Sequence, residues 1–179
     1  LVVAYPLVIA LGAKLNPITF IRKIANVAVF GFSTSSSAAT LPLNIKVCTE
    51  DFGVDESIAS FVLPLGMTIN MDGTAIYQCV ATIFLATCCG MTLTLGQMVT
   101  IVVTATLASI GTAGTPGAGM IMLAMVLEAM NIPVDMIMII YGIDRLFDMG
   151  RTCLNITGDI SCACCVTKWE SKKAAQTAK

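Results

Sequence analysis

Long apolar stretches separated by short polar segments run through most of the chain. Residues 57–127 contain a single charged residue, Asp72. A helix that crosses a bilayer needs roughly 20 predominantly apolar residues, so this stretch has room for three apolar segments. The pattern predicts an all-α integral membrane protein built from helical re-entrant hairpins and broken transmembrane helices.

Two of these apolar segments are too short to cross a membrane alone. Residues 96–110 and 119–130 each fall below the roughly 20 residues that a crossing requires. They meet at residues 111–119, which are rich in glycine and include a proline. Two short apolar arms joined by such a tip are typical of a re-entrant hairpin. We assign this second hairpin to residues 93–131.

The first third of the chain repeats this design with a different tip. Residues 1–16 have the pattern of the end of a spanning helix. Residues 17–52 have that of a first re-entrant hairpin, with a tip rich in serine and threonine at 33–40. A Ser/Thr run is commonly only a flexible turn. Its correspondence with the second tip favours a binding role, because both tips offer N–H groups or hydroxyls to an anionic ligand.

Each hairpin is followed by a long segment with a polar centre. We predict a transmembrane helix broken at 70–74 within residues 53–92, and a transmembrane helix with a polar stripe in residues 132–170. Residues 171–179 would form a cytoplasmic tail. The order of hairpin, broken helix, hairpin and polar helix is a weak internal repeat. Paired interrupted segments indicate a transporter whose binding site lies near the middle of the membrane.

The last predicted helix carries a stripe of polar side chains. At about 100° per residue they share an arc about 80° wide. The five are Asp144, Asp148, Arg151, Asn155 and Asp159. One interpretation is a purely structural pair between Asp148 and Arg151, three residues apart. Three acids beside one arginine favour a functional site, because carboxylates bind cations and a guanidinium binds a carboxylate ligand through two hydrogen bonds.

Asp72 also has two interpretations. It pairs with Arg145 or Arg151 across the helices, or it binds a small hard cation. Oxygen ligands suit Na⁺, and four side chains can supply them: Asn70, Asp72, Asn155 and Asp159. Glycines beside these residues permit local unwinding, which would free backbone carbonyls as further ligands.

The composition supports a membrane protein and argues against several other classes. Of the 179 residues, 56% are hydrophobic and 12% are charged, against roughly 25% charged in a soluble domain. The net charge is −1 and the chain has no histidine. This argues against nucleic-acid binding and against histidine-dependent catalysis or metal sites. We expect no enzymatic activity and no organic cofactor, and we interpret the 8 cysteines as helix-packing residues.

Basic residues gather in the predicted loops at two places. Lys14, Arg22, Lys23 and Lys46 flank the base of the first hairpin. The other group ends the chain and consists of Lys168, Lys172, Lys173 and Lys179. The positive-inside rule places both groups in the cytoplasm. We therefore expect a multi-pass protein of the cell membrane, in contact with the lipid bilayer, with a cytoplasmic C-terminus. The start of the chain has no signal-peptide pattern. Because the chain opens on Leu1 and not on a methionine, we also expect a piece of a longer protein.

Four motifs follow one another along the chain. They are Ser35-Ser36-Ser37 with Thr40-Leu41-Pro42; Asn70-Met71-Asp72-Gly73-Thr74; Gly111-Thr112-Ala113-Gly114 with Pro116-Gly117-Ala118-Gly119; and Asp148-Met149-Gly150-Arg151-Thr152 with Asn155 and Thr157-Gly158-Asp159. With these motifs, residues 1–170 resemble the glutamate transporter family, the dicarboxylate/amino acid:cation symporters. The resemblance implies an inverted-repeat transport domain that moves by an elevator mechanism. It also implies a homotrimer, assembled through scaffold helices that lie outside this chain.

The resemblance further implies the substrate and the residues that bind it. The substrate would be an acidic amino acid, glutamate or aspartate. Arg151 would bind its side-chain carboxylate and Asp148 its amino group. The assisting residues would be Thr152 and Asn155 in the last helix, Thr74 in the broken helix, and Ser36, Ser37, Thr115 and Gly119 at the hairpin tips. Relatives that take neutral amino acids tend to lack the arginine at position 151, so its presence favours acidic substrates.

Sodium would be the coupling ion, with ligands in three sites. The first site would use Gly66, Asn70, Asn155 and Asp159; the second Thr68, Ser109, Ile110 and Thr112; the third Asn70 and Asp72, with its other ligands upstream of residue 1. Some relatives carry an arginine where this chain has Ser35 or Met149, and Arg145 could compensate for it. Proton coupling, C4-dicarboxylate or neutral amino acid transport, an ion channel, and a membrane enzyme using Ser37 are the alternatives.

Overall fold

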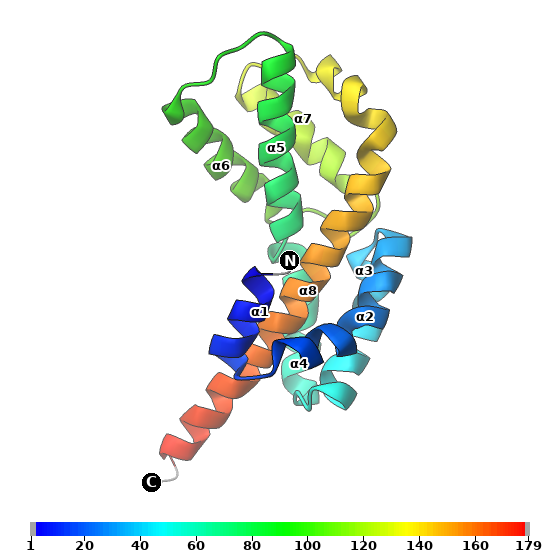
Figure 1. Cartoon of the computed structure of the whole chain (residues 1–179), viewed down its shortest axis with the longest axis vertical. Helices are drawn as coiled ribbons and strands as arrows, with labels where there is room; N and C mark the ends of the chain where they lie inside the picture. The colour runs from blue at the N-terminus through cyan, green and yellow to red at the C-terminus, as the bar shows by residue number, and fades with distance from the viewer. Residues whose placement is uncertain (1–2, 178–179) are drawn as a thin grey trace.

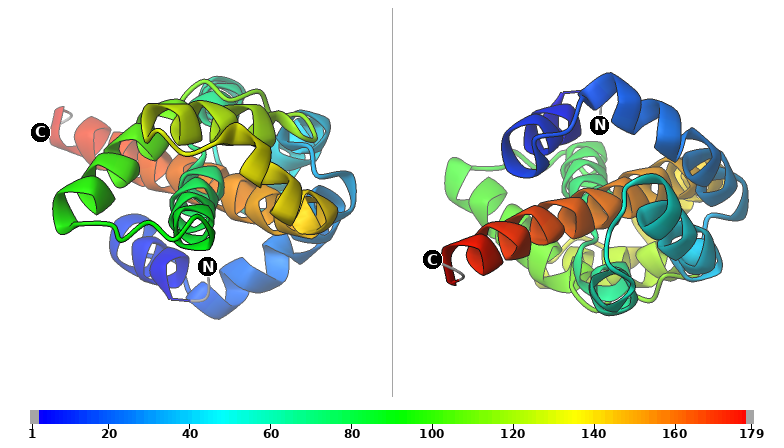
Figure 2. Two further views of the ribbon diagram at one scale, coloured as in Figure 1. Left: turned by 90° about the horizontal axis from the view of Figure 1, so that it is seen from above. Right: turned by 90° about the horizontal axis from the view of Figure 1, so that it is seen from below.

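The computed structural model describes residues 3–177 and is built from helices over that range. Figure 1 shows the longest helix, α8, running most of the length of the molecule. The elements are α1 (Ala4–Val8), η1 (Ile9–Ala13), α2 (Pro17–Thr34), α3 (Ser37–Lys46), η2 (Val47–Asp51), α4 (Glu56–Ile69), α5 (Asp72–Cys88), α6 (Leu95–Ser109), α7 (Ala118–Ala129), η3 (Val134–Ile137) and α8 (Met138–Thr177). The end-on views in Figure 2 show the other helices grouped around α8.

The chain bends sharply between its first two apolar helices. The pair Ala4–Ala13 and Pro17–Thr34 meets at 117°. Lys14 takes the left-handed conformation after η1, and the side chain of Asn16 accepts a hydrogen bond from the N–H of Ile18 to cap α2. Among residues 3–177, only this bent pair has the combined length and apolar character of a membrane span, and no single helix does.

The segment 17–52 folds back on itself at a serine turn. The buried residues of α2 recur at helical spacing, namely Phe20, Ile24, Val27 and Gly31. The helix ends because Ser35 adopts a left-handed conformation with φ of 50°. Ser36 then caps α3, since its Oγ accepts a hydrogen bond from the N–H of Ala39. The tip of this hairpin is therefore two serines long.

The predicted interruption in the segment 53–92 lies at Asn70 and Met71, between α4 and α5. Asp55 starts α4 by accepting hydrogen bonds from the N–H and the hydroxyl of Ser57. These bonds hold the pKa of the exposed Asp55 carboxyl below its usual range. At the break, Gly73 lies against α8, because a β-carbon there would come within 2.6 Å of the Arg151 carbonyl oxygen.

The second pair of short helices, α6 and α7, spans nearly the same residues as the predicted arms 96–110 and 119–130. Thr94 and Gln97 form a capping box at the start of α6. The tip between the helices contains two glycines with positive φ, Gly111 at 84° and Gly117 at 80°. Glycine adopts this backbone conformation without steric cost. Gly117 is also the N-cap residue that directly precedes α7.

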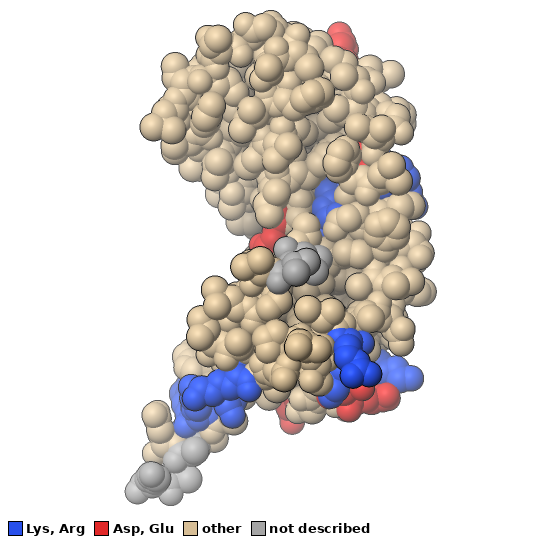
Figure 3. Space-filling model, viewed as in Figure 1, with Lys and Arg blue, Asp and Glu red and all other residues tan. Residues whose placement is uncertain are grey.

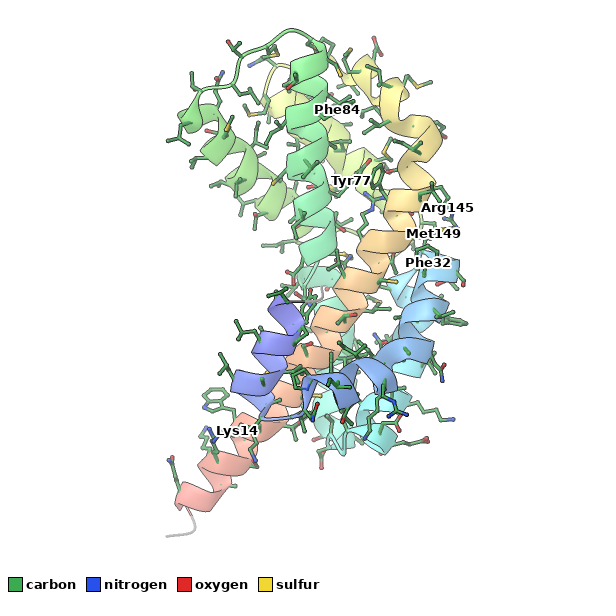
Figure 4. The ribbon with its side chains drawn as sticks, viewed as in Figure 1. Lys14, Phe32, Tyr77, Phe84, Arg145 and Met149 are labelled. Atoms are coloured by element: carbon green, nitrogen blue, oxygen red, sulfur yellow. The ribbon has the colours of Figure 1, made fainter. Side chains whose placement is uncertain are left out.

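The polar stripe lies on α8 and faces inward. Asp144, Asp148, Arg151, Asn155 and Asp159 are all buried. Arg145 projects from another side of the helix, with its side chain 53% exposed; Figure 4 shows it beside Met149 and Phe32. The helix continues through Thr177, so most of the segment assigned to a tail is helical, and residues 178–179 lie outside the described residues, as do residues 1–2 of the predicted N-terminal helix.

Two hydrophobic clusters hold the helices together, and α8 belongs to both. The hairpin-1 cluster joins residues of η1, α2, η2 and α4 to Ile156, Ile160, Ala163 and Cys164 of α8. The hairpin-2 cluster joins residues of α5 and α7 to Ile140 at the other end of α8. The polar stripe begins after Ile140 and overlaps the hairpin-1 cluster at Ile156, so the site lies where the two halves of the molecule meet.

The surface is mainly uncharged and apolar. Figure 3 shows most of the basic side chains gathered near the end of the molecule that carries the C-terminus, while the opposite half is mainly uncharged on this face and carries a few acidic and basic atoms. Large apolar side chains such as Phe61, Leu95, Ile121 and Leu146 are more than half exposed. An exposed apolar surface of this extent fits contact with lipid or with other membrane helices.

Candidate functional site

The tips of the two hairpins contact each other directly. The carbonyl oxygen of Gly114 accepts hydrogen bonds from the N–H of Ala38, at 3.1 Å, and from Oγ of Ser36, at 2.9 Å. We call this pair of bonds the tip contact. The second tip is also tied to the helix break, because the N–H of Gly111 donates to the carbonyl oxygen of Thr68 at 2.7 Å. The two tips and the break therefore lie around the part of α8 that carries Asp148 and Arg151.

A small cavity lies at this position. Its volume is about 20 Å³, which is room for about one water molecule. It is lined by Ser35, Ser37, Met71, Thr74, Thr112, Ala113, Gly114, Thr115, Gly119, Asp148, Arg151, Thr152 and Asn155. Eight of the nine residues expected to bind substrate are among these. The ninth, Ser36, instead caps α3 and makes the tip contact, while its neighbour Ser35 lines the cavity.

Arg151 is the central charged group of the cavity. Its Nε and Nη2 donate to Oδ1 of Asp148 at 3.2 and 2.9 Å, and Nη2 lies 3.5 Å from Oδ1 of Asp144. The guanidinium also stacks 4.4 Å from the ring centre of Tyr77. The remaining nitrogen, Nη1, is buried and has no hydrogen-bond partner among the described residues. Arg151 therefore keeps donors available for an anionic ligand.

Asp148 connects the second tip to α8. Its Oδ1 binds Arg151, and its Oδ2 accepts a hydrogen bond from the N–H of Gly117 at 3.1 Å. Arg145 approaches the same carboxylate at 3.9 Å from the exposed side. A ligand ammonium group that binds Asp148 would compete with Arg151 for this carboxylate.

Two tyrosines that bind the acidic side chains of this region were not expected from the sequence. The hydroxyl of Tyr77 donates to Oδ1 of Asp144 at 2.8 Å, and Figure 4 shows Tyr77 pointing from α5 toward α8. The hydroxyl of Tyr5 donates to Oδ2 of Asp72 at 2.9 Å. For Tyr77 a signal was present, since it lies three residues after Thr74 and so on the same face of α5. The position of Tyr5 gives no comparable signal.

Asn155 joins α8 to the start of α5. Its Oδ1 accepts a hydrogen bond from the N–H of Gly73 at 2.8 Å, and its Nδ2 donates to Oγ1 of Thr74 at 3.2 Å. The side chain therefore points toward the substrate cavity. Asn155 is one of the residues that line the small cavity.

Three residues of the first expected sodium site lie together at the helix break. Nδ2 of Asn70 donates to Oδ1 of Asp159 at 2.9 Å, and a β-carbon on Gly66 would come within 2.5 Å of the same Oδ1. Asp159 is 1% exposed and makes no ion pair among residues 3–177. A buried carboxylate without a basic partner is a costly arrangement that a bound cation would relieve.

Backbone hydrogen bonds connect the residues of the second expected site. Thr68 contacts Gly111, and the N–H of Thr112 donates to the carbonyl oxygen of Ser109. The side chain of Ile110 is a hydrocarbon, so this residue can offer only its carbonyl oxygen. In the third expected site, Asp72 pairs with neither Arg145 nor Arg151 among the described residues; it binds Tyr5.

The donors gathered here are suited to a hard monovalent cation. No three His, Cys, Asp or Glu side chains converge into a metal site within the described part of the chain. The oxygens come from single carboxylates, amides, hydroxyls and carbonyls at a helix break. This chemistry suits Na⁺ better than a transition metal.

Helical hairpins that meet over a polar cavity, within an otherwise apolar helical protein, define a membrane transporter. The comparison with protein families agrees, since the model of the Sodium:dicarboxylate symporter family matches residues 1–169. The chain belongs to this family. The fold class expected from the sequence, an all-helical membrane transporter of the glutamate transporter family, is thereby confirmed.

Curated relatives carry names of two kinds. The chain is 44% identical over 157 residues to an Excitatory amino acid transporter of Caenorhabditis elegans, covering 88% of this chain and 31% of the relative. It is 47% identical over 154 residues to human Excitatory amino acid transporter 5, and 46% identical over 154 residues to human Neutral amino acid transporter B(0). Each of these covers 86% of this chain and 28% of the relative. The chain spans less than a third of the length of these relatives.

Proposed function

We propose that this chain forms the substrate-carrying part of a transporter that moves glutamate or aspartate together with Na⁺. The observation that carries the proposal is the buried guanidinium of Arg151, which lines the cavity between both hairpin tips and keeps Nη1 without a partner. A neutral substrate side chain would leave these donors unsatisfied, whereas a carboxylate accepts two parallel hydrogen bonds from them.

Binding would exchange ion pairs within the cavity. The substrate ammonium group takes Asp148, which releases Nε and Nη2 of Arg151. The released guanidinium binds the substrate side-chain carboxylate. The α-carboxylate then lies near the first tip, where Oγ of Ser35 is buried without a partner and Ser37 lines the cavity. Thr74, Thr152 and Asn155 complete the polar lining.

The cavity must open before an amino acid can enter. A volume of about 20 Å³ holds about one water molecule, which is far smaller than glutamate. The second tip is held by a few hydrogen bonds: those of the tip contact, one to the carbonyl oxygen of Thr68 and one to the carboxylate of Asp148. We infer that the tips separate to admit substrate and close over it.

Sodium coupling is supported by the two carboxylates at the helix break. Asp72 and Asp159 make no ion pair among the described residues. Asp159 is buried and accepts a hydrogen bond from Asn70, whereas Asp72 is exposed and accepts one from Tyr5. Occupation by Na⁺ would order the break and the start of α5, whose Gly73 N–H and Thr74 hydroxyl bind Asn155. Cation binding would therefore prepare the substrate cavity. Proton coupling is the alternative at the same carboxylates.

The orientation and assembly follow from the surface. We place the end that carries Lys14, Lys23, Lys46 and Lys168 in the cytoplasm, in agreement with the positive-inside rule. The exposed apolar side chains contact lipid and the parts of the transporter outside this chain. A homotrimer and an elevator movement of this part against a static scaffold are proposed from the family relationship.

The test uses a chimera in which residues 1–169 replace the matched segment of human Neutral amino acid transporter B(0). We call it the test chimera. In liposomes with an inward sodium gradient it should take up labelled L-aspartate or L-glutamate, although its parent is named for neutral amino acids. A potassium gradient and a proton gradient serve as controls. Uptake of neutral amino acids alone would refute the acidic substrate, and uptake driven only by protons would refute sodium coupling.

A further inference from the structure

Tyr5 places the phenol oxygen of α1 at the helix break, beside the carboxylate of Asp72 that we propose as a cation ligand. Its Oη lies 2.9 Å from Oδ2 of Asp72, at the start of α5, and 3.2 Å from the carbonyl oxygen of Leu154, within α8. Three elements that are remote in sequence thus meet at one hydroxyl group. The site residues expected from the sequence do not include Tyr5.

The glycine at position 158 permits this convergence. A β-carbon on Gly158 would come within 2.9 Å of Oη of Tyr5 and within 2.5 Å of Nδ2 of Asn70. Both side chains therefore occupy the space that a side chain at position 158 would need. Asn70 uses its Nδ2 to donate to Asp159, so its Oδ1 is not engaged by that bond. Two hydrogen-bonded pairs, Tyr5 with Asp72 and Asn70 with Asp159, therefore lie on either side of this glycine.

The hydroxyl of Tyr5 has one proton and two acceptors within reach. A phenol donates one hydrogen bond and accepts others through its lone pairs. While Asp72 is a free carboxylate it is the stronger acceptor, since hydrogen bonds to charged groups are the stronger ones. A cation on Asp72 would reverse this preference. The proton would turn to the carbonyl of Leu154, and a lone pair of Oη would face the cation.

We propose that Tyr5 is a ligand of the cation bound at Asp72, with its proton on the Leu154 carbonyl while the cation is in place. This inference rests on the proposed sodium coupling. The carboxylate of Asp72 supplies the charge and Tyr5 supplies a neutral oxygen, a combination that suits Na⁺. Because Tyr5 belongs to α1, cation binding also fixes α1 against the helix break and α8.

The test replaces Tyr5 by phenylalanine in the test chimera. The ring remains, so packing is kept, and only the oxygen is lost. We expect the sodium concentration for half-maximal aspartate uptake to rise roughly tenfold, as for the loss of one bond to a charged group. The maximal rate at saturating sodium should change little. Lithium and sodium should also be discriminated less well, because the ligand set is altered.

Two controls separate ligation from a structural role. Tyr141→Phe removes a hydroxyl from a side chain that is 64% exposed and should leave the sodium dependence unchanged. Tyr5→Phe combined with Asp72→Asn should be no worse than Asp72→Asn alone, because both act on one bound cation. A lower maximal rate for Tyr5→Phe with an unchanged sodium curve would mean that Tyr5 only packs α1, and would overturn the proposal.

A second measurement does not depend on transport. Sodium should raise the unfolding temperature of the purified test chimera, and Tyr5→Phe should shift this effect to about tenfold higher sodium. If the chimera takes up no aspartate but retains this shift, the proposed substrate fails and the role of Tyr5 stands. If sodium stabilises the chimera and Tyr5→Phe equally at every concentration, the role of Tyr5 is refuted. If sodium stabilises neither protein, both the proposed sodium binding and the role of Tyr5 are refuted.

Discussion

Gly119 lies so close to the guanidinium of Arg151 that a side chain between them would displace it. A β-carbon at position 119 would overlap Nη1 and would come within 2.5 Å of Cζ. The second hairpin therefore packs its backbone directly on the charged group that we propose as the substrate ligand. The position of Arg151 depends on the absence of a side chain in α7.

Gly119→Ala tests this packing. The methyl group must push the guanidinium aside, and overpacking of this kind costs about 1–3 kcal/mol. We expect the apparent affinity of the test chimera for aspartate to fall about tenfold or more, as measured by the substrate dependence of uptake. Gly96→Ala is the matched control, because a β-carbon at position 96 in α6 meets nothing within 4 Å. Equal uptake by both variants would contradict the arrangement.

Arg151→Cys tests the substrate assignment. Charge-assisted bonds of Arg151 to a substrate carboxylate are worth about 3 kcal/mol, so uptake of aspartate should fall about 100-fold. Uptake of a neutral amino acid such as serine should appear or persist, which a misfolded protein could not show. Arg22→Cys removes an exposed arginine and should leave the selectivity unchanged. Unchanged aspartate uptake by Arg151→Cys would refute the role of this residue.

Asp159→Asn tests the buried carboxylate of the cation region. The amide keeps the shape of the side chain but removes the charge that we propose for cation binding. We expect the half-saturating sodium concentration to rise about tenfold or more, since bonds to charged groups are worth about 1.5–3 kcal/mol. The preference for aspartate over neutral amino acids should stay. Glu128→Gln makes the same chemical change at an exposed position, and its sodium curve should match the unmodified chimera.

Ser36→Ala tests the tip contact. The substitution removes the bond from Oγ to the Gly114 carbonyl and the cap of α3, a loss of about 1 kcal/mol. If closed tips retain the substrate, labelled aspartate should dissociate about fivefold faster from the variant. Ser33→Ala is the control, because the Ser33 hydroxyl bonds only within its own helix, to the Val29 carbonyl. A dissociation rate unaffected by Ser36→Ala would show that the tip contact does not retain substrate.

Local patterns predicted the helices and the polar face of α8 well. The burial of Asp144 and Asp159 on one stripe followed from helical periodicity, because a charge within an apolar helix has to face inward. The interruption at Asn70 followed from a polar and glycine-containing motif inside a long apolar run. Both are properties of neighbouring residues, which the amino-acid sequence displays directly.

Contacts between distant residues were harder to predict. Tyr5 and Asp72 are 67 positions apart, as are Tyr77 and Asp144, and no pattern along the chain links either pair. Ser36 shows a different difficulty. In a run of serines, the side chain that caps the helix cannot be told from those that face a ligand until the turn is known.

The sharing of α8 between two hydrophobic clusters sets an order in which the protein can fold during synthesis. The hairpin-2 cluster draws on residues between Ala81 and Ile140 and can close once α8 has begun. The hairpin-1 cluster starts at Ile9 but includes Ile156, Ile160 and Cys164. The core of the N-terminal half can therefore be completed only after the last helix has been made. Until then, the apolar faces of its helices stay without their partner helix, and transiently exposed apolar surface of this kind promotes aggregation.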